Sequence, residues 1–395
     1  MLEVVLWEWL DFVVRWLHVI AGIAWIGSSF YFVHLDLSLK QREGLPSGAH
    51  GEAWQVHGGG FYNMVKYLVA PARMPDQLTW FKWEAYTTWL SGMVLLVIVY
   101  YLSAELYLID QGILELEPWA AVAISVVGLA LGWVAYDLLC RSPLGRNDAA
   151  LAAVGFVFLT VLAWGFFQVF SGRGAFMQMG ALIGSIMVAN VFFVIIPGQR
   201  KVVAELIAGR DPDPELGRRG KQRSLHNNYL TLPVVFVMIG NHYPLAFAGR
   251  WSWAILAIVL IMGAVIRHFF NEQHKGARSP WWTWAVAAAG LAAIVWLSAE
   301  PANEAEEARA DTALVEEIML SRCSMCHAAE PVWEGVPRPP KGVVLETPEQ
   351  IRRQARAIGL QAVQTHAMPP GNITFMEESE RRALAAWIES GAPGW

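Results

Sequence analysis

Residues 9–32 read WLDFVVRWLHVIAGIAWIGSSFYF, a stretch in which apolar and aromatic side chains far outnumber charged ones. A helix needs roughly 20 mostly apolar residues to cross a bilayer, and this stretch exceeds that length with only Asp11 and Arg15 as formal charges. The residues before it are acidic (Glu3 and Glu8), and no small-residue cleavage site follows. A removable signal peptide has a basic start and such a site, so we expect a retained membrane span.

Comparable apolar runs follow along the chain up to residue 298. Eight spans are expected, at residues 10–32, 84–107, 118–139, 149–170, 179–197, 227–247, 251–270 and 281–298. The fourth and fifth are separated only by residues 171–178, where Gly172 and Gly174 fit a tight turn. Residues 1–299 are therefore expected to form an all-α, eight-helix transmembrane bundle embedded in the lipid bilayer.

Lys and Arg alternate between the expected loops, and such residues concentrate on the cytoplasmic side of a membrane. Every loop from an odd to an even span is basic: Lys40, Arg42, Lys66, Arg73 and Lys82; Arg141 and Arg146; Arg200, Lys201, Arg210, Arg218, Arg219, Lys221 and Arg223; Arg267, Lys275 and Arg278. The other loops contain mainly acidic residues: Glu105, Asp110, Glu115 and Glu117, with Arg173 alone after span four. Eight spans then place both termini outside the cytoplasm, on the periplasmic side of a bacterial inner membrane.

The composition changes after the last span. Residues 300–310 are rich in Glu and Ala and are expected to form a charged linker, and residues 311–395 read as a small soluble domain. This domain contains Cys323-Ser-Met-Cys326-His327. Cys-x-x-Cys-His is a c-type haem attachment signature, in which both thiols join the haem and the imidazole binds its iron. A zinc half-site or a redox dithiol would not need His327, and no second close cysteine pair exists.

The sixth iron ligand is expected from a later loop. Met368 lies in the segment His366-Ala-Met368-Pro-Pro-Gly-Asn, and His/Met ligation is typical of electron-transfer cytochromes. His366 is the main competitor, and Met325 and Met376 are poorer ones. In bacteria, c-type haem is attached outside the inner membrane, which agrees with the orientation inferred from the loops.

Other classes are disfavoured by charge and cysteine content. The net charge of −5 gives no case for nucleic-acid binding. The third cysteine, Cys140, ends an apolar run and is interpreted as structural, so no disulfide framework is implied. The sequence leaves homo-oligomerisation open.

Polar side chains inside spans are costly and point to function by default. One hypothesis is haem b ligation by histidines of spans one and six, with His18 paired with His242 and His34 paired with His226. The phase of the helix argues against one helix pair serving both haems, since 16 residues at about 100° each place the two histidines on nearly opposite faces. Asp11 and Arg15 are four residues apart on one helix face, and the alternative to a functional role is that they form an ion pair with each other.

A second hypothesis is a pocket for a small planar polar ligand near the cytoplasmic ends. Its candidate groups are His57 beside the run Gly58–Gly60, and Asn227, Asn228, Arg267 and His268. Such pockets combine an apolar wall with a few placed polar groups. For each histidine, an interfacial position or an ordinary hydrogen bond remains the alternative.

Together, residues 9–32, the His57-Gly-Gly-Gly-Phe-Tyr62 segment, the eight spans and the trailing cytochrome domain resemble the bacterial membrane-bound, cytochrome c-coupled urate oxidases (urate hydroxylases). The resemblance covers essentially the whole chain, and residues 9–32 are its most specific part. It implies oxidation of urate to 5-hydroxyisourate in purine breakdown, with electrons passing to haem c. A respiratory cytochrome c or terminal oxidase would take them onward, and oxygen would not be the direct acceptor.

No catalytic residue of the membrane part is carried over from the resemblance. Two rivals remain: a membrane-anchored electron-transfer subunit that oxidises quinol or a partner enzyme, and a transporter or sensor with an attached haem domain. Urate oxidation releases two electrons whereas one haem c holds one, so transfers must be sequential or a further redox centre must exist.

Overall fold

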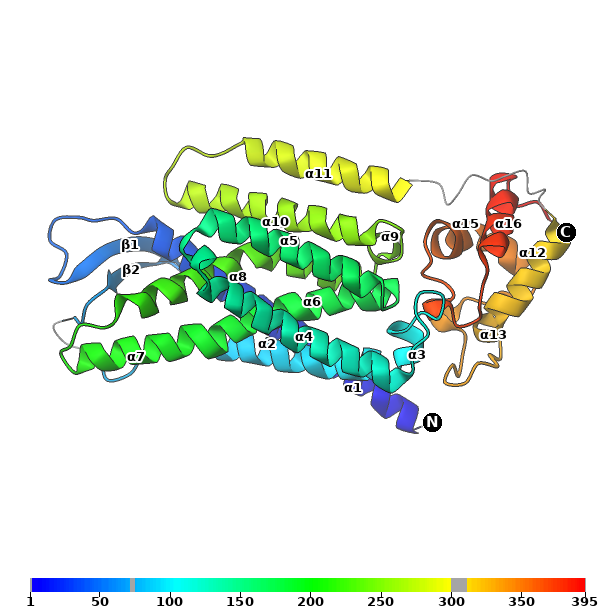
Figure 1. Cartoon of the computed structure of the whole chain (residues 1–395), viewed down its shortest axis with the longest axis horizontal. Helices are drawn as coiled ribbons and strands as arrows, with labels where there is room; N and C mark the ends of the chain where they lie inside the picture. Colours follow the sequence, from blue (N-terminus) through cyan, green and yellow to red (C-terminus); the bar gives the residue numbers. More distant parts are fainter. Residues whose placement is uncertain (1, 72–74, 300–310, 395) are drawn as a thin grey trace.

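The computed structural model describes residues 2–71, 75–299 and 311–394. It is almost entirely helical, with one two-stranded hairpin (Figure 1). The expected linker at 300–310 lies outside the described residues. The first part contains α1 (Leu2–Ser38), β1 (Ala49–His57), β2 (Gly60–Tyr67), α2 (Trp83–Leu95), α3 (Ala104–Tyr107), α4 (Pro118–Arg141), α5 (Asp148–Phe167), α6 (Gly172–Ala189), α7 (Ile196–Ile207), α8 (Pro214–Gly240), α9 (Pro244–Phe247), α10 (Ser252–His274) and α11 (Trp282–Ala299).

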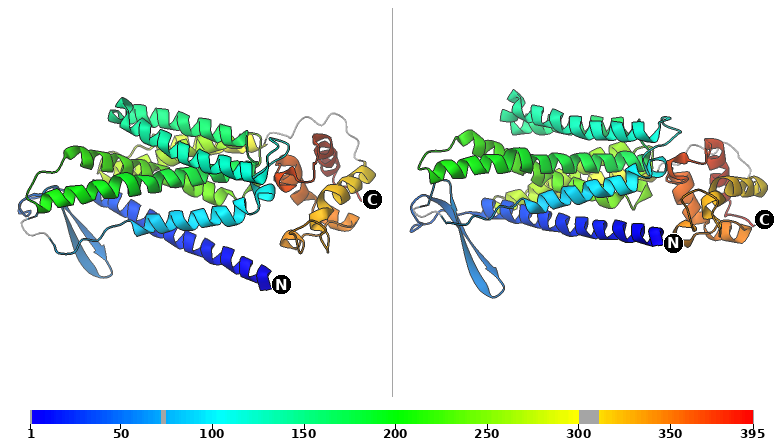
Figure 2. Two further views of the ribbon diagram at one scale, coloured as in Figure 1. Left: turned by 60° about the horizontal axis from the view of Figure 1, so that its bottom comes forward. Right: turned by 90° about the horizontal axis from the view of Figure 1, so that it is seen from below.

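The long helices lie side by side in one elongated bundle (Figures 1 and 2). Among the described residues, seven helices are long and apolar enough to cross a membrane, where α6 and α7 count as one because a π-helical segment, Asn190–Ile195, joins them. The helix α8 is not among the seven, since its first half is strongly charged. It nevertheless packs against α6 and α10 within the bundle.

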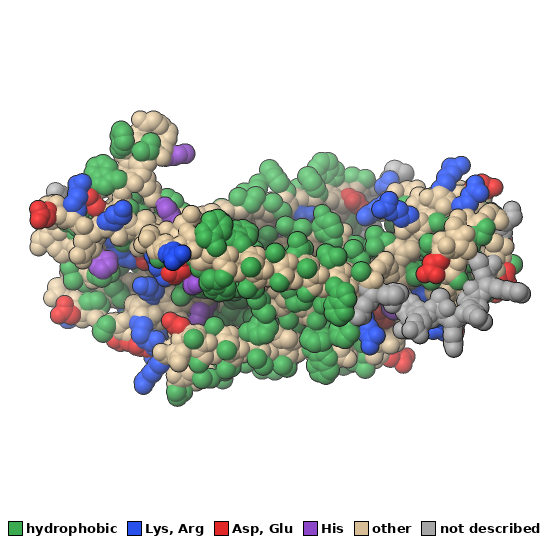
Figure 3. Space-filling view, turned by 90° about the horizontal axis from the view of Figure 1, so that it is seen from above, with side chains coloured by type: hydrophobic (Ala, Val, Ile, Leu, Met, Phe, Trp, Pro, Cys, Tyr) green, Lys and Arg blue, Asp and Glu red, His purple; other side chains and the backbone are tan. Residues whose placement is uncertain are grey.

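The bundle surface has the character expected of a membrane protein. Large apolar side chains point outward from several helices, including Trp119, Trp164 and Trp296. Figure 3 shows an apolar belt along the middle of the molecule, with Lys and Arg at its two ends, the hairpin end and the C-terminal unit. Soluble proteins rarely expose continuous apolar surface of this kind.

Several boundaries predicted from sequence are wrong. The first span is longer than residues 10–32, since α1 covers Leu2–Ser38, and the helix of the second ends at Tyr101. Residues 172–178 are helical rather than a turn, because Ser171 caps α6: its Oγ accepts a hydrogen bond from the Gly174 backbone N–H at 3.0 Å. The fifth span continues past Pro197 to Ile207, since the π-helical segment just before the proline accommodates its missing N–H. The predicted span at 227–247 is not one helix, because α8 starts earlier, at Pro214, and ends at Gly240.

The hairpin is a departure from the all-α expectation. The strands β1 and β2 pair in antiparallel register, with His57 opposite Gly60. Gly58 and Gly59 form the two-residue turn with φ of 59° and 80°. Positive φ at both positions matches the type I′ turn that two-residue hairpins favour, and glycine adopts it without strain.

The second part of the chain is a small helical unit. It contains α12 (Thr312–Ile318), α13 (Ser324–His327), α14 (Pro348–Arg353), α15 (Ala355–Ile358) and α16 (Glu378–Glu389). Its core is built around the fully buried Trp387 and Leu384 of α16. The start of α1 and this unit lie at the same end of the bundle (Figures 1 and 2), opposite the hairpin.

Candidate functional site

At the hairpin end, α8 and α10 bring together three polar side chains deep in the bundle. The Arg267 guanidinium donates from Nε to Asn228 Oδ1 at 3.3 Å and from Nη2 to Asn271 Oδ1 at 3.1 Å. Asn271 Nδ2 donates to the same Asn228 oxygen at 3.0 Å. The four-residue spacing of Arg267 and Asn271 places both on one face of α10. We call these three residues, with Phe30, the Arg267 cluster.

The charge of Arg267 is enclosed and has no acidic counterpart. Its side chain is only 4% exposed, and within the described part of the chain no carboxylate forms an ion pair with it. The Phe30 ring of α1 lies under the guanidinium at 3.9 Å from its centroid, a cation–π contact. Buried charges are normally paired or bound to a ligand.

The cluster also holds a hydrogen-bond donor without an acceptor. Asn228 is fully buried, and its Nδ2 has no partner among the described residues. An unsatisfied buried polar group costs about 1–3 kcal/mol. The cluster therefore offers N–H groups that an acceptor from outside the protein could satisfy.

Two histidines continue the contact between α1 and α10. The rings of His34 and His274 meet edge to face with centroids 4.4 Å apart, and Nδ1 of each is buried without a partner within the described residues. His34 follows Phe30 by four residues, and His274 follows Arg267 by seven, so each lies on the same helix face as its predecessor. His274 was not a sequence candidate, although its spacing from Arg267 and Asn271 would have indicated it.

The neighbouring candidate His268 lies at the edge of this region. Its Nδ1 is 3.3 Å from the Tyr229 hydroxyl, and its ring packs near Trp282 at 6.1 Å between centroids. Figure 3 shows histidine side chains at the rim of a hollow where the apolar belt meets the basic end. The sequence-predicted group of Asn228, Arg267 and His268 is thus in one region.

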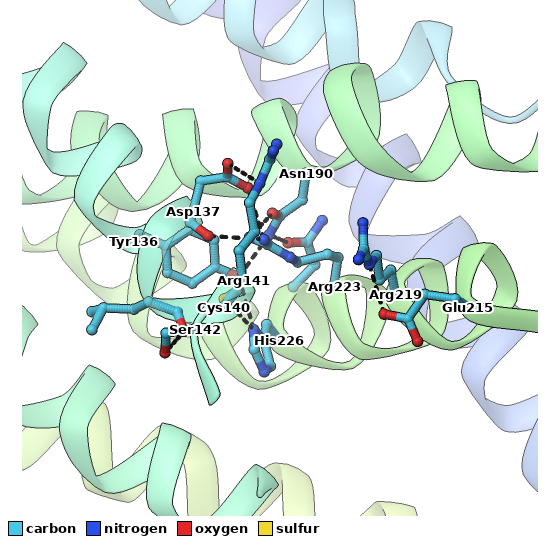
Figure 4. A network of polar contacts seen from close by, with 12 residues as sticks. Tyr136, Asp137, Cys140, Arg141, Ser142, Asn190, Glu215, Arg219, Arg223 and His226 are labelled. Carbon is cyan, nitrogen blue, oxygen red and sulfur yellow. Dashed lines mark hydrogen bonds and ion pairs between the residues drawn. The ribbon is translucent and has the colours of Figure 1, made fainter. Parts of the chain in front are cut away.

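A second buried arginine has the opposite electrostatic situation. Arg223 of α8 is 3% exposed, and its Nη2 donates to Asp137 Oδ1 at 2.7 Å (Figure 4). Its Nη1 donates to Asn190 Oδ1 at 3.1 Å, and Arg141 reaches the other Asp137 oxygen at 2.6 Å. Here the guanidinium is neutralised by the protein itself.

The candidates Asn227 and His226 belong to this second network and not to the Arg267 cluster. Asn227 Oδ1 accepts from Asn190 Nδ2 at 2.9 Å, and its own Nδ2 donates to the Met187 carbonyl at 2.9 Å. His226 Nδ1 lies 2.8 Å from the Tyr136 hydroxyl (Figure 4). The oxygen and the nitrogen of the Asn227 amide both have hydrogen-bond partners, which fits a structural role.

The remaining membrane-domain candidates lie apart. His18 Nδ1 lies 3.0 Å from the Thr88 carbonyl on α2, and Gly92 leaves room for the ring. His242 and His57 are exposed, the latter at the hairpin turn. Asp11 and Arg15 form the expected ion pair at 2.7 Å. Among the described contacts, neither the His18–His242 pair nor the His34–His226 pair occurs, and His34 packs on His274.

The c-type haem motif stands at the end of a helix. Thr312–Ile318, Met319–Cys323 and Ser324–His327 follow one another without a break. Cys323, Cys326 and His327 occupy positions i, i+3 and i+4, which share one helix face. His327 Nδ1 lies 2.9 Å from the Val343 carbonyl, and because a carbonyl only accepts, Nδ1 is the protonated nitrogen. Nε2 is then left for iron, the arrangement usual for a metal-binding histidine.

The electrostatics of this motif favour neutral groups. Burial raises the pKa of the Cys323 thiol to about 12, so the residue is a neutral thiol at physiological pH. Cys326 shifts in the same direction, also because of burial. The donor set of two partly buried thiols and one oriented imidazole fits covalent haem c.

Met368 lies in a loop that the protein holds at its backbone. Its N–H donates to the Gln361 carbonyl at 2.8 Å, and its carbonyl accepts from Arg381 Nη1 at 3.0 Å. The competitor His366 has Nε2 3.6 Å from Glu378, and Met376 is buried in the core of the small unit. Of these three residues, Met368 is the one whose side chain has neither an ion pair nor a place in the buried core among the described residues.

The same loop contacts the end of the helical bundle. The His366 N–H donates to the Ala248 carbonyl at 2.9 Å, and Gln364 Nε2 donates to the Ser298 carbonyl at 2.9 Å. A Cβ on Gly371 would lie 2.5 Å from the Ile109 carbonyl oxygen, so the loop and bundle meet closely there. The segment containing Met368 is thus docked on the bundle end opposite the hairpin.

Comparison with known proteins adds the family. Residues 4–298 match the family model described as urate oxidase N-terminal. No curated protein and no solved structure gave a match. The matched range covers the helical bundle from α1 to α11, including the Arg267 cluster, and amounts to well over half of the chain. The chain therefore belongs to the urate oxidase N-terminal family, which indicates an oxidoreductase that acts on urate.

Proposed function

We propose that this protein is a membrane-bound oxidoreductase that converts urate to 5-hydroxyisourate and passes the electrons to a haem c on its own C-terminal unit. One observation supports the proposal above the others. A bundle of the urate oxidase N-terminal family is joined in one chain to a helix that presents Cys323, Cys326 and His327 on one face. A respiratory cytochrome c or terminal oxidase would accept the electrons afterwards.

The reaction balances with water as the oxygen source. Urate and one water give 5-hydroxyisourate, two protons and two electrons. A bound haem c would supply a one-electron acceptor, so the two electrons leave one after the other. Oxygen is then not consumed at the urate site, and no hydrogen peroxide forms.

The chain's residues have two tasks in this scheme. Cys323 and Cys326 hold the haem, and His327 and Met368 bind its iron. The His34–His274 pair provides ring nitrogens without other partners, which can accept the protons released from urate and water. A haem b is not part of the proposal, because His18 and His226 face Thr88 and Tyr136, and His34 packs on His274.

We further propose eight spans, with α8 as the eighth, in a bacterial inner membrane. The basic hairpin end then faces the cytoplasm, and the α1 start and the cytochrome c unit face the periplasm. This arrangement is supported by the outward apolar surface and by the common end of α1 and the small unit.

The test is anaerobic mixing of detergent-purified protein with urate while the optical band of haem c is followed. We expect reduction of the haem, two equivalents per urate, and formation of 5-hydroxyisourate. Covalent haem is checked by haem staining after denaturing electrophoresis, and should vanish when Cys323 and Cys326 are both replaced by serine. Reduction by quinol but not by urate would overturn the proposal in favour of an electron-transfer subunit.

A further inference from the structure

We propose that the Arg267 cluster is the urate site of the membrane domain, in which the guanidinium binds the planar urate anion. The inference rests on the proposed function, which requires such a site without saying where it is. It begins from the two buried arginines of the bundle, which differ in one respect.

Arg223 and Arg267 are equally buried, at 3% and 4% exposure. Arg223 faces the Asp137 carboxylate at 2.7 Å, whereas Arg267 donates to two amides and packs on one aromatic ring, with no carboxylate paired to it among the described residues. A buried charge without a counter-ion destabilises the protein by several kcal/mol. Such a charge is tolerable where a ligand anion completes the site, and a urate monoanion has the required sign.

The donors that remain free match the edge of a planar anion. Arginine has five N–H groups in a fixed fork, and the two amides use Nε and Nη2. Asn228 Nδ2 is a further buried donor without an acceptor. The urate monoanion presents three carbonyl oxygens and one deprotonated ring nitrogen along its edges, which can accept from both groups, and bidentate binding by arginine suits a flat acceptor.

Aromatic and imidazole rings stand beside these donors. Phe30 packs against the guanidinium, and His34 and His274 follow it along the same contact between α1 and α10. Flat apolar faces beside convergent polar groups are the usual composition of a site for a small ring compound. The two imidazoles are also next to the point where protons would be released.

The decisive variant is Asn228→Asp, which places a carboxylate of the same shape beside Arg267. The new carboxylate would accept from Arg267 Nε and would remove the orphan donor. We expect the variant to unfold at a higher temperature than the wild type and to bind urate about tenfold or more weakly, because the internal anion competes for the guanidinium. If the cluster were purely structural, Asn228→Asp would raise the unfolding temperature and leave the affinity for urate unchanged.

A matched control lies at the other end of the same helix. Asn241 Oδ1 accepts from Arg173 Nε at 2.8 Å, so Asn241→Asp makes the same change beside a different arginine. We expect it to leave urate affinity unchanged. Arg267→Lys is the second variant, since it keeps the charge but loses the fork, and we expect weaker urate binding with the helical content preserved.

Urate affinity is measured by equilibrium dialysis of the oxidised protein without oxygen, with Met368→Ala as background so that turnover is slow. Unaltered affinity in both Asn228→Asp and Arg267→Lys would overturn the inference while leaving urate oxidation intact. A wild-type protein that neither binds urate nor is reduced by it would overturn the proposed function, and the inference with it.

Discussion

Replacing Gly263 with alanine is expected to separate α10 from α8 and to disrupt the Arg267 cluster. Gly263 lies one helical turn before Arg267, and Pro233 lies on α8 shortly after Asn228. A Cβ on Gly263 would be 2.5 Å from Pro233 Cδ and 2.7 Å from Cγ. Carbon atoms in contact normally stand about 3.5–4.0 Å apart, so a shift of about 1 Å is needed.

The proline ring cannot rotate away, so the backbones must move. The hydrogen bond from Arg267 Nε to Asn228 Oδ1 is already 3.3 Å long, and an added separation of about 1 Å takes it beyond the hydrogen-bonding range. Overpacking of this kind typically costs 1–3 kcal/mol. We expect a lower unfolding temperature and a raised KM for urate.

The assay compares thermal unfolding in detergent with the rate of haem c reduction at several urate concentrations. Gly184→Ala is the control, because nothing lies within 4 Å of its added Cβ, and alanine generally favours a helix over glycine. A Gly263→Ala variant with the wild-type unfolding temperature and the wild-type rate of reaction with urate would refute the close crossing of α8 and α10 at this point.

Three further predictions follow from the contacts. Asp137→Asn should lower the free energy of unfolding by about 3–5 kcal/mol, because it leaves Arg223 buried and unpaired. Denaturant unfolding measures this free energy, and an unchanged midpoint would contradict the ion pair at 2.7 Å. Met368→Ala should retain covalent haem on a denaturing gel. The haem reduction potential should fall, because the variant lacks the thioether ligand that raises this potential. An unchanged potential would exclude Met368 as the ligand. Gly371→Ala should loosen the C-terminal unit from the bundle, because its Cβ would meet the Ile109 and Glu105 carbonyls at 2.5 and 2.9 Å. Under the proposed function, urate should then reduce the haem more slowly at unchanged haem content, and a wild-type rate would speak against the docking.

Long apolar helices are the part of the fold that the sequence predicts well. The expected spans at 118–139, 251–270 and 281–298 differ from α4, α10 and α11 by a few residues, because burial in lipid requires length and apolarity, both of which are local properties. The Cys-x-x-Cys-His motif is local in the same way, because its five residues are contiguous in the sequence.

Features that depend on packing were not predictable. Gly172 and Gly174 suggested a turn, but they allow α6 to start against its neighbours: a Cβ on Gly174 would lie 3.0 Å from the Leu108 carbonyl. The partner of Arg223, Asp137, lies 86 positions earlier in the sequence, and no periodicity connects them. The approach of His274 to His34 likewise depends on how α1 and α10 lie together.

The hairpin was missed for a different reason. The strand residues do not alternate between one buried and one exposed face, and only Gly51, Glu52 and Ala53 are buried in β1. Sequence patterns detect strands chiefly by that alternation. The run Gly58–Gly60 stands out in the sequence, but it indicates a hairpin turn only once the flanking residues are known to pair.

The contacts from Gln364 to Ser298 and from His366 to Ala248 have a kinetic consequence. A separate cytochrome would have to find the enzyme by diffusion, and its supply would limit turnover. A unit tethered to the last helix meets its docking surface as an intramolecular event, at an effective concentration commonly in the millimolar range. Under the proposed function, this arrangement would make the supply of the first electron acceptor independent of how densely the membrane is populated.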